Sequence, residues 1–200
     1  MSGLDRALLL LTGILAAYQV SVGIDGLETL PIIAYTIAFG VLLVAGLLLI
    51  IQGFEVLDSP VVVIVSTVIP LSLSLGLVWE RLAFLRIPYL IFAILGFLAV
   101  LITRSVAMPG RLLPVLVLAV VHGLAGITIF LLPVILAVTG EAQPGFALVG
   151  VGGGLIGLGG LLLSFLKVGK PILSRESIFQ VLPGLLALTT AAFVAGFVCG

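Results

Sequence analysis

His122 is the only histidine of the sequence and stands inside a long apolar stretch, residues 112–138. As a helix, this stretch places the imidazole about 15 Å from its start, at 1.5 Å per residue. The imidazole could hydrogen-bond a substrate, act as a proton-sensing switch, or be an axial ligand to a haem or chlorophyll. A structural hydrogen bond to a neighbouring helix is the alternative. No cofactor is predicted outright, and a pigment or haem at His122 stays a hypothesis.

A second set of polar residues has helical spacing. Ser66, Pro70 and Ser74 are four residues apart and share one helix face, with Thr67 beside them. A proline in a helix leaves a carbonyl that a hydroxyl or water can satisfy, so this face could line a cavity or join two helices. The candidate binding residues are His122, Gly126, Ser66, Thr67 and Ser74.

The apolar stretches carry no aspartate, glutamate, lysine or arginine at mid-length. Buried carboxylates are typical of ion-coupled pumps, hydrolases and metal sites, so their absence disfavours all three. Glu80 and Arg81 lie at the end of a stretch, where we expect them to be solvated. Cys199 is the single cysteine, and no Gly-x-Ser-x-Gly motif occurs. We therefore predict no catalytic residue, no metal site and no enzyme.

The composition shows which elements must position these residues. Of the 200 residues, 62% are hydrophobic and 8% are charged, whereas soluble domains carry about a quarter charged residues. The net charge is zero, which gives no attraction for nucleic acid. We predict an all-α integral membrane bundle of about seven transmembrane helices. The expected spans are 5–22, 30–52, 60–79, 86–103, 112–138, 146–167 and 177–198.

The positive charges predict an orientation. With a cytoplasmic N-terminus, only Arg81 and Arg86 lie outside, and seven spans place the C-terminus outside as well. The inner basic residues are then Arg6, Arg104, Arg111, Lys167, Lys170 and Arg175. The aromatic residues of the outer interface are Tyr18, Tyr35, Trp79 and Tyr89, which predicts a distinct role for the outer face. A secretory signal peptide is the competing interpretation of the first span.

Two segments resemble each other in a way that predicts an internal duplication. Residues 40–49 read GVLLVAGLLL and residues 154–163 read GLIGLGGLLL. The predicted organisation is a first three-helix repeat in 1–80, a linker helix in 81–108 and a second repeat in 109–200. The small sugar transporters of the SWEET type share this helix count, but their Pro-Gln signature is absent. A microbial rhodopsin needs a lysine in the seventh span, which has none.

The sixth span carries a glycine stripe that predicts close helix packing, within the bundle or against another chain or a cofactor. Its members are Gly150, Gly153, Gly154, Gly157 and Gly160.

Two functions are consistent with these features. The first is a small transporter or channel for a neutral solute or lipid, without charge coupling inside the membrane. The alternative is a non-catalytic subunit or assembly factor of a larger membrane complex. The expected partners are membrane lipid and either other membrane proteins or further copies of the chain. The short connections suit a prokaryotic plasma membrane or internal membrane.

Overall fold

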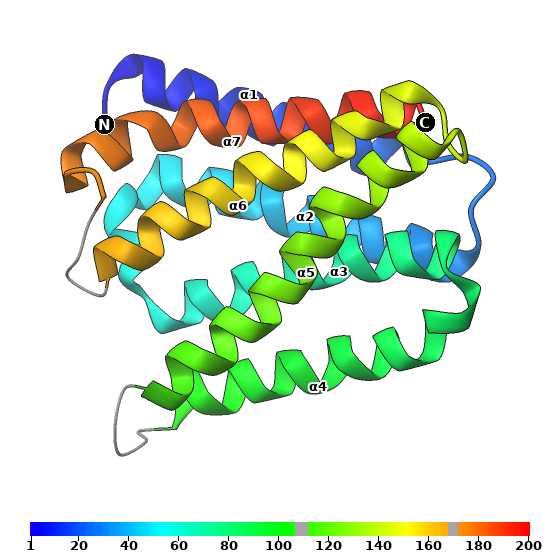
Figure 1. Cartoon of the computed structure of the whole chain (residues 1–200). Coiled ribbons are helices and arrows are strands. Elements are labelled where there is room, and N and C mark those ends of the chain that lie inside the picture. The colour runs from blue at the N-terminus through cyan, green and yellow to red at the C-terminus, as the bar shows by residue number, and fades with distance from the viewer. Residues whose placement is uncertain (107–111, 168–171) are drawn as a thin grey trace.

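The computed structural model describes residues 1–106, 112–167 and 172–200 (Figure 1). Seven helices are long and apolar enough to cross a membrane, as predicted, and the described residues contain no strand. The helices are α1 (Gly3–Val22), α2 (Thr29–Gln52), α3 (Pro60–Arg81), α4 (Arg86–Ser105), α5 (Leu112–Thr139), α6 (Ala147–Lys167) and α7 (Arg175–Val198). Each boundary lies within two residues of the prediction. The 3-10 segments are η1 (Phe54–Asp58), η2 (Ala83–Leu85) and η3 (Pro144–Phe146).

Local chemistry explains where several helices begin and end. Ser2 and Asp5 form a reciprocal capping box at the start of α1, and the Ser174 side chain accepts the Ser177 amide at the start of α7. Gly23 and Gly53 follow α1 and α2 with positive φ angles of 70° and 75°. Glycine has no Cβ to oppose this conformation, so the chain can turn there.

Six helices form a closed ring. Around the ring, α1 contacts α2, α2 contacts α3, α3 contacts α5, α5 contacts α6, α6 contacts α7, and α7 returns to α1. Helix α4 lies outside this ring and packs against α3 and α5 (Figure 1). Arg111 and Lys170 belong to the predicted connections that lie outside the described residues.

The ring is filled by buried hydrophobic side chains, five of which are aromatic. Tyr35 and Phe39 of α2 meet Phe193 and Phe197 of α7, with Phe146 of η3 beside them. A second, smaller core joins α3, α4 and α5 through Leu71, Ala93, Val100, Val121 and Ala125. Helices α4 and α5 are the most exposed. In the apolar 18-residue segment of each span, 17% of the residues are buried in α4 and in α5, against 50% in α7. Their outward faces are apolar, which is compatible with a position in a lipid bilayer.

The two ends of the bundle have different connections. We call the end where α7 finishes the C-terminal end; it holds the connections 23–28, 82–85 and 140–146. The opposite end, which holds Met1 and the connection 53–59, is the N-terminal end. Figure 1 shows the two chain termini at these opposite ends.

Candidate functional site

A hollow of about 520 Å³ opens at the C-terminal end of the bundle. It lies where α3 finishes and where the chain passes from α5 into η3. The lining residues are Arg81, Ala137, Gly140, Glu141, Ala142, Gln143, Pro144 and Gly200. Its volume is in the range of small-molecule sites, about 300–1,000 Å³, although it is more open than an enclosed ligand pocket.

Arg81 is the cationic wall of the hollow. One of its guanidinium nitrogens, Nη2, lies 2.8 Å from Glu80 Oε1, and the guanidinium carbon lies 4.8 Å from the centre of the Phe146 ring. The Arg81 and Glu80 side chains are only 25% and 21% exposed, so they are less solvated than the sequence predicts. Tyr35 of α2 lies beside Glu80, and Phe146 of η3 lies beside Arg81, which reduces the exposure of both side chains. Arg81 Nε is buried and forms no hydrogen bond with a described residue.

Tyr35 lies behind this ion pair. Its ring packs against Gly76, where a larger residue could not fit, and is 3% exposed. Its hydroxyl interacts electrostatically with Glu80 and Arg81, but makes no hydrogen bond of standard geometry within the described part of the chain. The interfacial tyrosine that the sequence predicts is therefore a core residue here.

A polar network holds α4 at the same end. Trp79 Nε1 donates to Glu28 Oε2 at 2.9 Å, and Arg86 Nη2 donates to Glu28 Oε1 at 2.9 Å. Arg86 Nε also donates to the Trp79 carbonyl at 2.7 Å. The Trp79 hydrogen bond, together with the Arg86 guanidinium, holds the pKa of the Glu28 carboxyl below its ordinary value of 4.5. The network ties the connection before α2 to the ends of α3 and α4.

The candidate side chains of α3 donate hydrogen bonds to backbone carbonyls of their own helix. The hydroxyls of Ser66 and Thr67 donate to the Val63 carbonyl at 3.0 and 2.7 Å, and that of Ser74 donates to the Pro70 carbonyl at 2.6 Å. Thr67 and Ser74 are fully buried. These side chains therefore line no hollow in the described structure.

Ser74 also lies next to a polar contact that joins two other helices. The Tyr89 hydroxyl of α4 lies beside Ser74 and donates to Thr128 Oγ1 of α5 at 3.3 Å. The sequence pattern identified Ser74 but neither partner. Their proximity depends on how α3, α4 and α5 pack, and spacing along one helix does not contain that information.

His122 is half-buried on α5, and its imidazole interacts with the Leu118 backbone one turn earlier, although the buried Nδ1 atom makes no hydrogen bond of standard geometry within the described residues. Arg104 of α4 is the charged group that interacts with it electrostatically. Gly126 is half-buried one turn further along α5, and a Cβ built there would meet no atom within 4 Å. His122 makes no hydrogen bond to Ser66, Thr67 or Ser74. The structure does not gather these five candidates into one pocket.

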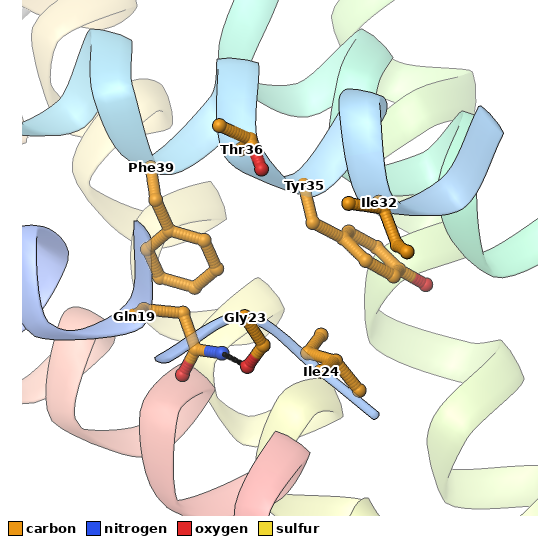
Figure 2. Close-up of a pocket in the computed structure, with 7 residues that line it drawn as sticks. All are labelled: Gln19, Gly23, Ile24, Ile32, Tyr35, Thr36 and Phe39. Carbon is orange, nitrogen blue, oxygen red and sulfur yellow. Dashed lines mark hydrogen bonds between the residues drawn. The ribbon is translucent and has the colours of Figure 1, made fainter. Parts of the chain in front are cut away.

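The inside of the ring contains little free space. The cavity between α1 and α2 measures about 10 Å³, roughly the room that one water needs (Figure 2). Figure 2 shows Gln19 and Phe39 on opposite walls, with the Gln19 amide nitrogen turned toward the Gly23 carbonyl, 2.9 Å away. Neither this cavity nor the hollow at the C-terminal end is a solute-sized chamber inside the ring.

No known protein family, curated protein or solved structure matches this chain. The function of the protein must therefore be inferred from its own residues. The described residues contain no cluster of three or more histidine, cysteine, aspartate or glutamate side chains that could hold a metal ion.

The first half of the glycine stripe packs against α5. A Cβ on Gly150 would lie 2.6 Å from the Phe130 carbonyl oxygen, and one on Gly153 would lie 3.0 Å from backbone atoms of Ile129 and Phe130. A Cβ on Gly154 would lie 3.3 Å from the Phe130 ring. These glycines allow α5 and α6 to approach backbone to backbone.

The second half of the stripe faces outward. A Cβ on Gly157 or Gly160 would meet no atom within 4 Å, and both residues are exposed. Two glycines outside the predicted stripe, Gly152 and Gly159, instead receive side chains of α7. The stripe therefore divides between packing inside the bundle and a surface that is open in the single chain.

Proposed function

We propose that this chain is an integral membrane protein that serves as a non-catalytic subunit or assembly factor of a larger membrane complex. The supporting observation is the filled interior of the ring. The cavity between α1 and α2, about 10 Å³, has room for one water, and five buried aromatic side chains occupy the centre of the ring. A carrier or channel needs a space for its solute, whereas a scaffold needs only a rigid shape.

The exposed part of α6 favours an assembly role. Gly157 is bordered by Leu158 and Leu161, which are 56% and 55% exposed. Without a hydrophobic driving force in lipid, membrane helices associate where small residues allow close backbone contact. This surface is one on which a helix of a partner could lie. His122 is the residue at which such a complex could hold a pigment or haem.

The membrane topology is part of the same proposal. We propose that the N-terminus lies in the cytoplasm of a prokaryotic cell and that the C-terminal end of the bundle faces outside. The support is the distribution of lysine and arginine together with the aromatic residues at the C-terminal end. A reporter fused after Gly200 should be found outside; a cytoplasmic reporter would contradict this orientation.

The test is to extract the protein from its native membrane in mild detergent and to determine the particle's size, composition and absorbance spectrum. We expect a large particle with other subunits, and Gly157→Leu should release this chain from it. The control is Ile94→Phe, which adds bulk to an exposed position of α4 and should leave the particle intact. A pigment or haem band should be lost on His122→Ala. A small colourless particle containing only this chain would contradict the proposal.

A transporter is the second candidate, and the ring itself favours it. If residues 1–80 and 109–200 are repeats, the contact of α3 with α5 and that of α7 with α1 are equivalent by a pseudo-two-fold axis. Helix α4 then lies outside as a linker, the construction common in transporters. Solute or lipid flux into proteoliposomes containing only this chain would establish this alternative. Ser66→Ala, Ser74→Ala and His122→Ala would be the first variants.

A further inference from the structure

The hollow at the C-terminal end lies at the level where the helices leave the apolar layer. Arg81 is the last residue of α3, and Thr139 is the last residue of α5. Trp79 precedes Arg81 by two residues, and tryptophan is enriched where the lipid headgroups begin. A ligand in this hollow would therefore stand among phospholipid headgroups.

Two side chains of opposite charge line the hollow, Arg81 and Glu141. Glu80 pairs with Arg81 Nη2, and Arg81 Nε is buried, so a phosphate in the hollow would meet the terminal N–H groups of the guanidinium. The ion pair with Glu80 and the contact with the Phe146 ring restrain the guanidinium before any ligand arrives. A guanidinium held in this way can share its remaining N–H groups with a phosphate.

Glu141 supplies the opposite charge. It is exposed, and within the described part of the chain its side chain accepts one hydrogen bond, from the Thr139 hydroxyl to Oε1 at 3.2 Å. A carboxylate accepts about four hydrogen bonds, so its oxygens have capacity for an ammonium group. Gln143, also on the lining, adds an amide oxygen as a further acceptor.

We propose that the hollow binds the headgroup of a zwitterionic phospholipid with a primary ammonium, its phosphate at Arg81 and its ammonium at Glu141. A primary ammonium donates three hydrogen bonds, as a lysine head does, whereas a quaternary choline donates none. Phosphatidylglycerol carries the same phosphate but no ammonium, so its headgroup would leave the Glu141 charge unneutralised. The hollow therefore favours phosphatidylethanolamine over phosphatidylcholine and phosphatidylglycerol. This inference is independent of the complex-subunit proposal, because a single chain in lipid can test it.

The experiment measures lipid retention by native mass spectrometry, after exchange with vesicles of these three lipids with identical acyl chains. We expect at least a tenfold preference for phosphatidylethanolamine, and displacement by excess glycerophosphoethanolamine because recognition lies in the headgroup. Equal retention of the three lipids would overturn the proposal. So would a preference for phosphatidylglycerol, or a failure of the soluble headgroup to compete.

Two variants separate the two charges. Glu141→Gln should abolish the preference over phosphatidylcholine while phosphate binding remains, and Arg81→Gln should lower retention of all three lipids tenfold or more. Arg81→Lys keeps the charge and serves as the folding control, and Arg175→Gln removes a charge at the opposite end. Because Glu141 is exposed, its variant keeps the test decisive even if Arg81→Gln does not fold. An unchanged preference in Glu141→Gln would overturn the proposal.

Discussion

The two ends of the bundle are held together in different ways. At the C-terminal end, the ring closes through buried aromatic side chains: Tyr35 and Phe197 have ring centres 4.7 Å apart, and Phe39 meets Phe193 at 6.4 Å. At the N-terminal end, η1 meets α7 through Phe54 and Phe179, which stack at 4.9 Å and are only half-buried. The same ring of helices therefore has an aromatic core at one end, whereas the other end is closed by buried aliphatic side chains such as Leu9, Leu49 and Ile178 together with this half-buried stack.

In the proposed lipid environment, this difference determines how firmly the helices associate at each end. An apolar side chain gains little when it moves from lipid into the bundle, so packing and close backbone contact decide how firmly helices associate. Between α5 and α6, close backbone contact is concentrated toward the C-terminal end, where Gly150 and Gly153 bring α6 onto α5. Around Gly157 and beyond it, α6 has no equivalent contact with α5. We infer that the N-terminal end separates first when the protein is stressed.

The largest expected effect comes from removing a ring at the buried end. Phe193 is fully buried, and Phe193→Ala should lower the free energy of unfolding by about 2–4 kcal/mol, less than in some soluble cores because lipid contributes no hydrophobic transfer term. Phe54→Ala is the matched change at the other end and should cost about 1 kcal/mol or less, the size of one aromatic pair. Denaturant titration in detergent measures both values. Equal losses would refute the proposed difference between the ends.

A second contrast lies within α6 alone. Gly150→Ala places a Cβ 2.6 Å from a backbone oxygen, so α5 and α6 must separate, at a cost of about 1–3 kcal/mol. Gly157→Ala meets no atom within 4 Å and should stabilise the helix by up to about 1 kcal/mol through propensity. The thermal midpoints of the two variants should therefore move in opposite directions. Shifts of the same sign would mean that α5 and α6 do not diverge along their length.

The sequence was sufficient to predict the helices, but it predicted less of how they pack. Apolar length and turn residues predicted all seven helices, because each must satisfy its own backbone hydrogen bonds. Spacing also placed Gly150 and Gly157 on one stripe, but it could not show that only Gly150 meets α5. That depends on the angle at which two helices cross, which one helix's periodicity does not fix.

The hollow was not predicted for a related reason. Arg81 and Glu141 are 60 positions apart in the sequence and come together through the ends of α3 and α5. The available signal was the set of aromatic residues at one end, which predicted a distinct role for that face without naming its residues. The interaction of Tyr89 with Ser74 and Thr128 was missed likewise, because its three members come from three helices.

The polar contacts of the two ends should differ in the same direction as the packing, with smaller effects. Because the folded-state pKa of Glu28 is lowered, its contribution to stability is present above the unfolded-state pKa and is lost as the pH falls through the folded-state value. We therefore expect stability to decrease as the pH drops below about 4.5, and Glu28→Gln to remove this part of the decrease. Thermal midpoints between about pH 6 and pH 3 measure it. An equal decrease with falling pH in Glu28→Gln would contradict this assignment.

The smallest effect belongs to the ion pair of the N-terminal end. Arg175 Nη2 and Asp58 Oδ2 lie 3.4 Å apart, and their side chains are 52% and 65% exposed. A double-mutant cycle with Arg175→Gln and Asp58→Asn should give a coupling of about 0.5 kcal/mol or less, which salt should reduce further because exposed charges are screened. Glu28, by contrast, is bound by two donors that are themselves fixed to each other. A coupling above about 2 kcal/mol between Arg175 and Asp58 would mean that polar contacts stabilise the N-terminal end as strongly as the C-terminal end. The order in which the two ends separate would then have to be explained by the glycines of α6 alone.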